Sequence, residues 1–241
     1  VGKVAAYDRE RGSAALGELE RDIRIVDPET LEELPRETEG EIWVRGQVVA
    51  GGYLGNDTAT AQTFVASHTL LSSSRQPCAD LPGHSHWLRT GDCGVVDEEG
   101  YLYLRGRYKD IIIIRGKNIY PDDVETAVTA SEPSLLRPGR SAAFSVDDDT
   151  CERRHIVAEV RTASGIPEET TLLIAAKKVI AAVREAIGVT PGRVTFLKQN
   201  DIPVTSSGKI RRSATKSLDV EGKLRSLYVY ESATDAGEGE E

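Results

Sequence analysis

The apolar pattern of the chain changes character near residue 109, and this change constrains the fold more than any other feature. Before it, short segments alternate apolar and polar residues between Gly, Pro and Asp turns, which is typical of antiparallel strands. After it, the aliphatic run 111–114 is followed by segments with helical periodicity and by further strands. The sequence therefore predicts an α+β chain, with a boundary at Arg107–Asp110 between a β-rich part and a mixed part.

The first part is expected to hold short strands and one helix. The expected elements are a strand and hairpin around Asp27-Pro28, a strand before a bend at Gly51-Gly52, a helix over 57–65 capped by Asp57, a surface loop over 72–86, and two strands around an Asp97–Gly100 turn. Residues 1–19 have a weak pattern and predict no clear element.

The second part is expected to mix strands and helices. The expected elements are a strand at 111–114, a basic Gly loop, a helix starting near Pro121, two strands joined by an acidic turn within 141–162, a helix over 170–187 ended by Gly188, a strand near 192–203, and a short helix from Lys209 onward. The last residues are acidic and lack apolar side chains, so 223–241 are assigned to a tail or linker.

Composition excludes several classes of protein. The 241 residues include 39 acidic and 30 basic side chains, and a net charge of −9 disfavours a nucleic-acid or membrane-surface binder. The aliphatic run 111–114 is far shorter than the roughly 20 apolar residues that a membrane-spanning helix needs. Three scattered cysteines without metal-ligand spacing favour free thiols, no metal site and a cytoplasmic location. Because the chain contains no Met, we expect it to be a piece of a longer protein.

Four short segments carry residues suited to nucleotide chemistry. Asp92 stands between two glycines in RTGD, where its two carboxylate oxygens are able to accept both hydroxyls of a ribose. Arg107 and Lys109 lie at the end of a predicted strand, and Arg115, Gly116 and Lys117 form a basic loop that suits phosphate. For each of these segments taken alone, an ordinary turn or a solvated basic surface is the more common explanation.

The fourth segment is VTSSGKIRR, in which Lys209 follows Gly208. A lysine is a mobile point charge that suits a phosphate. The segment is not a P-loop, because Pro203 and Ile210 occupy the positions where that motif requires Gly and Ser or Thr. A surface lysine at the start of a helix is the alternative interpretation.

The order and spacing of these segments carry more information than any one of them. GEIWVRGQVVAGGYLGN, WLRTGD, YLYLRGRYKDIIIIRGKNIYPDDVE and TSSGKIRR resemble, in this order, the later signature motifs of the adenylate-forming superfamily. That superfamily includes acyl- and aryl-CoA ligases, luciferases and the adenylation domains of nonribosomal peptide synthetases. The resemblance covers about residues 20 to 220. Within the superfamily, GRYKDIIIIRGKNIYPDDVE and LRPGRSAAFSV are most similar to fatty acyl-AMP ligases.

The resemblance implies a role for each candidate residue. Asp92 matches the aspartate that holds the ATP ribose, and Arg107 matches an arginine that contacts the ribose and phosphate region. Lys109 matches the hinge about which a small C-terminal domain swings. Lys209 matches the catalytic lysine that reaches the α-phosphate and the substrate carboxylate. It also implies that residues 1–108 end a large adenylation domain and that 109–222 form the mobile C-terminal domain.

The implied reaction joins a fatty acid to ATP as an acyl-adenylate, which passes to an acyl carrier protein or a polyketide synthase module. The phosphate loop, the adenine-contacting segment and the Mg²⁺ ligands of the superfamily have no counterpart in this sequence and are expected upstream. This piece alone is therefore not expected to catalyse. An acyl-CoA ligase, with CoA in place of the carrier, and a non-catalytic regulatory module are the two alternatives.

Overall fold

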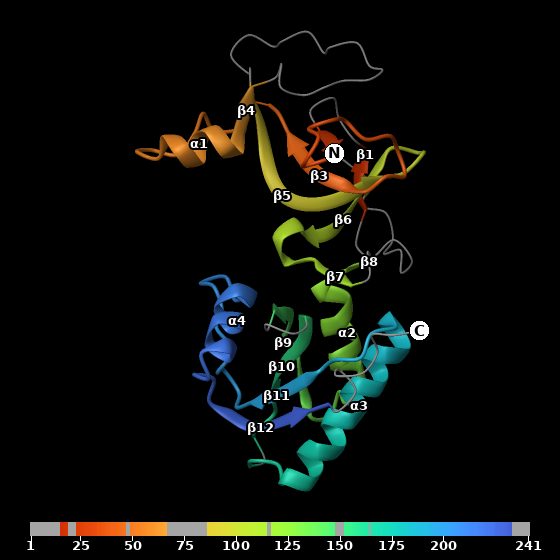
Figure 1. Cartoon of the computed structure of the whole chain (residues 1–241), viewed down its shortest axis with the longest axis vertical. Coiled ribbons are helices and arrows are strands. Elements are labelled where there is room, and N and C mark those ends of the chain that lie inside the picture. Colours follow the sequence, from red (N-terminus) through yellow and green to blue (C-terminus); the bar gives the residue numbers. More distant parts are fainter. Residues whose placement is uncertain are drawn as a thin grey trace. The chain divides into compact units, whose positions relative to one another are not determined.

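The computed structural model describes residues 15–18, 23–46, 49–66, 86–114, 117–147, 152–163 and 165–232. The chain divides into two compact units, Val1–Lys109 and Asp110–Glu241, and each unit has its own sheet (Figure 1). Helices and strands occur together, which confirms the predicted α+β class.

The first unit is built around an antiparallel sheet with the strand order β1-β6-β5-β3-β2, in which β4 also pairs with β5. Its strands are β1 (Ala15–Glu18), β2 (Ile23–Val26), β3 (Gly40–Val44), β4 (Phe64–Ala66), β5 (His86–Val96) and β6 (Tyr101–Arg107). The alternation of apolar and polar residues explains the pairing of β2 with β3. Ile25 lies opposite Ile42, and both belong to the apolar core with Val96 and Leu102.

The turns of this unit follow the predicted chemistry. Asp27 accepts hydrogen bonds from the backbone N–H groups of Glu29 and Thr30, which fixes the turn after β2. Asp97 is buried between β5 and β6 and accepts bonds from the Tyr101 backbone (2.7 Å) and the Tyr103 hydroxyl (3.0 Å). These two turns confirm the expected hairpins.

The short helix α1 (Asp57–Thr63) exists, but its predicted cap is wrong. Asn56, not Asp57, is the N-cap, and its side chain accepts a bond of 3.0 Å from the Ala59 backbone. Asp57 lies in the first turn of the helix instead. Both are good capping residues, so composition alone did not decide between them. Most of the predicted loop 72–86 lies outside the described residues, and His86 begins β5.

The second unit combines a four-stranded sheet, a small hairpin and three helices within its described residues. The elements are β7 (Ile112–Ile114), β8 (Lys117–Ile119), α2 (Pro121–Ser131), β9 (Leu136–Asp147), β10 (Glu152–Val160), α3 (Glu169–Ile187), β11 (Arg193–Leu197), α4 (Arg212–Val220) and β12 (Ser226–Glu231). The sheet order is β12-β11-β10-β9, with β10 and β11 parallel and the other pairs antiparallel. The 3-10 turn η2 (Tyr108–Asp110) precedes β7.

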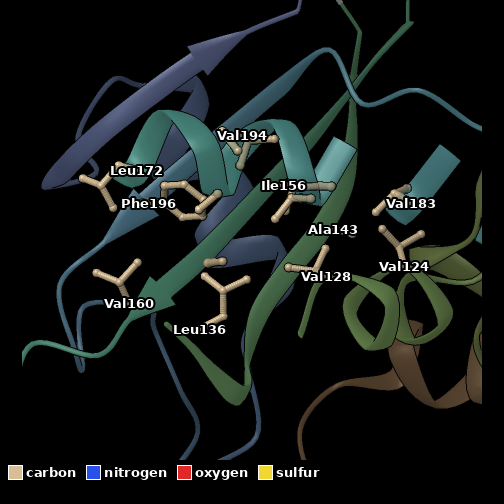
Figure 2. Close-up of a cluster of buried hydrophobic side chains, with 14 of the residues drawn as sticks. Val124, Val128, Leu136, Ala143, Ile156, Val160, Leu172, Val183, Val194 and Phe196 are labelled. Carbon is tan, nitrogen blue, oxygen red and sulfur yellow. The ribbon is translucent and has the colours of Figure 1, made fainter. Parts of the chain in front are cut away.

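The core of the second unit lies where α2 and α3 cover the sheet (Figure 2). The predicted apolar face of α3 is confirmed, because Leu172, Ala176, Val179 and Val183 are buried. Each fully buried Val or Leu contributes about 1.5–3 kcal/mol, so this stripe, more than helix propensity, holds α3 on the sheet. Gly188 ends the helix in the left-handed conformation, also as predicted.

Two predictions for the C-terminal region are wrong. The helix expected from Lys209 begins at Arg212, because a hairpin occupies the preceding residues. Residues 226–231, assigned above to a tail, form β12, the edge strand of the sheet. Leu227, Tyr228 and Tyr230 on this strand pack against the core, which explains why it pairs despite the acidic residues that follow. Residues 233–241 lie outside the described part of the chain.

Candidate functional site

The first group of candidate residues lies at one end of the β5–β6 hairpin. Asp92 and Arg107 are direct cross-strand partners, and Arg107 Nε lies 3.1 Å from Asp92 Oδ1. Their side chains are 38% and 55% exposed, so the pair contributes only about 0–1 kcal/mol to folding. In the part of the protein that the structure describes, Arg107 is the ion-pair partner of Asp92. The pair is thus an open carboxylate and guanidinium that a ligand is able to engage.

A buried carboxylate that the sequence analysis did not single out supports the RTGD turn. Glu41 on β3 is 4% exposed, and its Oε1 accepts a bond of 3.2 Å from the Gly91 backbone. Its Oε2 accepts bonds from Trp43 Nε1 (3.0 Å) and Arg89 Nε (2.9 Å). Glu41 therefore ties the residue before Asp92 to the neighbouring strand. The available signal was a charged residue inside an otherwise buried strand.

Thr90 completes the support of this turn. Its hydroxyl donates to the Ile42 carbonyl (2.7 Å) and accepts from the Asp92 backbone (3.0 Å). Gly91 adopts φ +70°, a left-handed conformation that favours glycine. Arg89, Thr90 and Gly91 of the RTGD segment thus each help to hold this turn, which directs the Asp92 carboxylate outward.

The basic residues near the unit boundary are only partly placed. Lys109 is exposed, lies in η2 and is the last residue of the first unit. Lys117 is exposed at the start of β8. Arg115 and Gly116 lie outside the described residues. Among the residues that the structure describes, neither Lys109 nor Lys117 has an ion-pair partner, which leaves both charges available to solvent or ligands.

Lys209 lies in a tight hairpin, residues 204–210, rather than at a helix start. Val204 and Ile210 form the bridge at its base, and Thr205 N donates to the Lys209 carbonyl (2.8 Å). Gly208 has φ +83°, and a Cβ added there would meet nothing within 4 Å. The glycine is therefore required by the backbone conformation of the turn and not by a close neighbour. The Lys209 side chain is exposed and has no partner among the residues that the structure describes.

Two buried polar pairs hold the chain on either side of the hairpin. Glu159 on β10 is fully buried, pairs with Arg137 and accepts a bond of 2.9 Å from the Ile202 backbone. Further along, His155 Nδ1 lies 2.6 Å from Asp219 Oδ2, which attaches α4 to β10. These pairs fix the segments before and after the hairpin to the same strand.

Arg212, the first residue of α4, makes the densest set of ion pairs near the hairpin. Its Nε and Nη2 contact Glu125 Oε1 (2.6 Å) and Oε2 (2.7 Å), and Nη2 also pairs with Asp122. The hydrogen bonds that Arg212 donates to Glu125 raise the pKa of Arg212, and burial raises the pKa of the Glu125 carboxyl while Arg212 opposes that rise. Sequence inspection missed this pairing because the two residues lie 87 positions apart.

Within the described ranges, no cluster of three or more His, Cys, Asp or Glu side chains suits a metal ion. The helices that the structure describes are also too short or too polar to cross a membrane.

Comparison with known proteins shows which proteins the chain resembles. The chain is 37% identical over 194 residues to the long-chain-fatty-acid–AMP ligase FadD26 of Mycobacterium tuberculosis, a match that covers 80% of this chain and 31% of that protein. It is 39% identical over 197 residues to 4-hydroxyphenylalkanoate adenylyltransferase of Mycobacterium marinum, covering 80% and 29% of the two chains. Over most of its length, this chain resembles the adenylate-forming superfamily. No model of a known protein family matches it.

A solved structure of the superfamily agrees with the fold. The structure of McyG A-PCP complexed with phenylalanyl-adenylate superposes with a TM-score of 0.67 and 26% identity, covering 86% of this chain and 33% of that chain. The chain thus spans about a third of the length of the superfamily members that it matches.

Proposed function

We propose that this chain is the C-terminal part of a fatty acyl-AMP ligase. The observation that carries the proposal is the identity of 37% to a long-chain-fatty-acid–AMP ligase, over 194 residues that make up most of the chain. A second relative, named an adenylyltransferase, also takes a carboxylic acid as its substrate by name. Both names describe activation of a carboxylate as an adenylate. ATP and a carrier thiol are both intracellular, so we propose the cytoplasm as the compartment.

In this proposal the two units have different tasks. Residues 1–108 form the last, β-rich subdomain of the large domain, and the C-terminal domain begins at residue 109. We extend that domain from residue 222 to 231, because β12 completes its sheet. Lys109, exposed at the boundary of the two units, is the proposed hinge.

The available side chains suit parts of a nucleotide. The Asp92 carboxylate, directed outward by its turn, is assigned to the ribose hydroxyls, and Arg107 beside it to the ribose and phosphate region. Lys209, an exposed ammonium on a rigid hairpin, is assigned to the α-phosphate and the substrate carboxylate. Arg115, Gly116 and Lys117 are proposed to contact a phosphate or the carrier. The Mg²⁺ ligands are assigned to sequence upstream of this chain, where the resemblance to the superfamily places them.

The reaction follows from these assignments. An oxygen of the fatty carboxylate attacks the α-phosphorus of ATP, the bond to the β-phosphate oxygen breaks, and pyrophosphate leaves. Negative charge gathers on the phosphoryl oxygens in the transition state, where the Lys209 cation stabilises it. In the second half-reaction a carrier thiol attacks the acyl carbon, loses its proton, and AMP leaves.

A product analysis of the complete enzyme tests this proposal. The enzyme is incubated with ATP, a long-chain fatty acid and either CoA or a phosphopantetheinylated carrier protein, and acyl-AMP, acyl-CoA and acyl-carrier are quantified by mass spectrometry. We expect acyl-AMP to accumulate with CoA present and acyl-carrier to form. Efficient synthesis of acyl-CoA would move the assignment to an acyl-CoA ligase. Absence of pyrophosphate release with any carboxylic acid would favour a non-catalytic module.

A further inference from the structure

The guanidinium of Arg212 joins three carboxylates from separate parts of the second unit. Two of them, Glu125 and Asp122, lie on α2, and the third, Asp110, is the first residue of the unit, with its Oδ2 3.8 Å from Arg212 Nη1. Asp110 directly follows the proposed hinge residue Lys109. Arg212 itself begins α4, three residues after Lys209. Arg212 therefore links Asp110, which follows the proposed hinge, to the segment that carries Lys209.

The contact between Arg212 and Glu125 is a partly buried, two-pronged pair. The Arg212 and Glu125 side chains are 21% and 14% exposed. Glu125 Oε1 accepts a second bond, of 3.1 Å, from the Ala143 backbone, so the pair also reaches β9. A planar guanidinium is able to satisfy both carboxylate oxygens at fixed geometry, whereas a lysine ammonium offers only a point charge.

The hairpin has few other attachments. Arg140 Nη1 donates to the Gly208 carbonyl at its tip (3.1 Å), and Arg211 N donates to the Pro203 carbonyl at its base (2.9 Å). All of the residues 204–209 are exposed, so apolar packing contributes little to their position. The ion pairs of Arg212, two residues after the hairpin, restrain the chain where it leaves the hairpin.

We propose that Arg212 is a positioning residue for Lys209, through which the hairpin is held rigidly to α2 and to the residue that follows the hinge. The proposal rests on the proposed function only for the catalytic task of Lys209. Arg212 does not touch the reacting atoms. It ensures that the lysine turns with the whole unit and arrives at one fixed orientation.

The positional claim is tested on the 241-residue chain without any substrate. Hydrogen exchange read by mass spectrometry is compared among wild type, Arg212→Lys, Arg212→Gln and the control Arg193→Gln. The control removes a more exposed ion pair, with Glu231, that joins β11 to β12. We expect hydrogen exchange across residues 203–211 to become about tenfold faster or more in both Arg212 variants. Without the ion pairs of Arg212, the hairpin should open locally more often. The sheet peptides and the control should match wild type.

Two exchange results would overturn the claim. Unchanged protection of residues 203–211 in both variants would show that Arg212 does not restrain the hairpin. Equal loss of protection throughout the sheet, even in Arg212→Lys, would show that the residue stabilises the whole unit and has no particular link to the hairpin.

The catalytic consequence is tested in the complete enzyme. For Arg212→Lys we expect kcat of adenylation to fall about 10- to 100-fold, since small misplacement of a catalytic group costs this much. The KM for ATP and the transfer of acyl from preformed acyl-AMP should stay within about threefold, because they do not need the aligned lysine. Full activity of Arg212→Lys would overturn the proposal, since charge alone would suffice. If wild type itself makes no acyl-AMP, the proposed function fails, whereas the exchange experiment still decides the role of Arg212.

Discussion

Replacing Glu41 by Gln should weaken the RTGD turn while it leaves most of the stability of the first unit intact. The two oxygens of Glu41 have different partners, because Oε1 accepts from Gly91 N and Oε2 from Trp43 Nε1 and Arg89 Nε. A glutamine is able to keep its carbonyl oxygen toward Trp43 and Arg89. Its NH₂ group then faces the Gly91 N–H, and two donors cannot bond. The substitution therefore removes the bond to the turn and keeps the bonds to the core.

The expected magnitudes differ for Gln and Ala. In Glu41→Gln one backbone bond and the charge are lost, which should cost about 1–2 kcal/mol. In Glu41→Ala the indole N–H of Trp43, which is fully buried, loses its acceptor, and Arg89 loses its carboxylate. Breaking such a pair costs up to about 3–5 kcal/mol, and because Arg89 is 29% exposed to water we expect about 3 kcal/mol.

Tryptophan fluorescence measures these effects in the first unit alone, because both tryptophans of the chain, Trp43 and Trp87, belong to it. Denaturant unfolding is followed for wild type, both Glu41 variants and the exposed control Glu29→Gln. Nucleotide affinity of the complete enzyme is then measured for the Gln variant, for which we expect weaker binding. Equal destabilisation by Gln and Ala, or wild-type nucleotide affinity of Glu41→Gln, would refute the assignment of Glu41 to the turn.

Three further results are expected. Gly208→Ala should loosen the 204–210 hairpin more than Gly208→Asn, by about 1 kcal/mol or less, because φ +83° strains alanine more than asparagine; equal hydrogen exchange in the two variants would contradict this. Burial, reinforced by Glu39, raises the pKa of Cys93 above its ordinary value of 9.0, so folding stability of the first unit should fall as pH rises above about 9, and the fall should be smaller in Cys93→Ala. The 241-residue chain alone should bind ATP weakly and release no pyrophosphate above an enzyme-free blank. Measurable release would contradict the expectation that the rest of the ATP site lies in upstream sequence.

Local periodicity was enough to predict most of the fold. Residues 170–187 place apolar side chains on one helical face, and Gly188 ends that helix, because both signals act over a few residues. Alternation around Asp97 likewise predicted β5 and β6. β12 was missed because the acidic segment after it dominated the interpretation, although Leu227 and Val229 alternate with two tyrosines.

The contacts that hold the candidate residues in place could not be predicted from the sequence. For Glu41, Glu125 and Glu159, the sequence pattern does not show which groups the carboxylates contact. Their burial is explained by partners 43 to 87 positions away, which only the fold brings together. For Lys209, the sequence correctly indicated a turn at Gly208 but not the hairpin, because a turn before a helix and a hairpin tip use the same residue types.

Adenylation by the complete enzyme with Lys209→Ala tests the central claim most directly. At about 4 Å and an effective dielectric near 20, a unit charge pair is worth roughly 4 kcal/mol, and part of this already acts on bound ATP. We therefore expect pyrophosphate release to fall at least about a hundredfold while ATP affinity, folding and transfer from preformed acyl-AMP change little. The exposed helix lysine variant Lys177→Ala should behave as wild type. Near-normal adenylation by Lys209→Ala would contradict the account, since Lys209 would then be an ordinary surface residue.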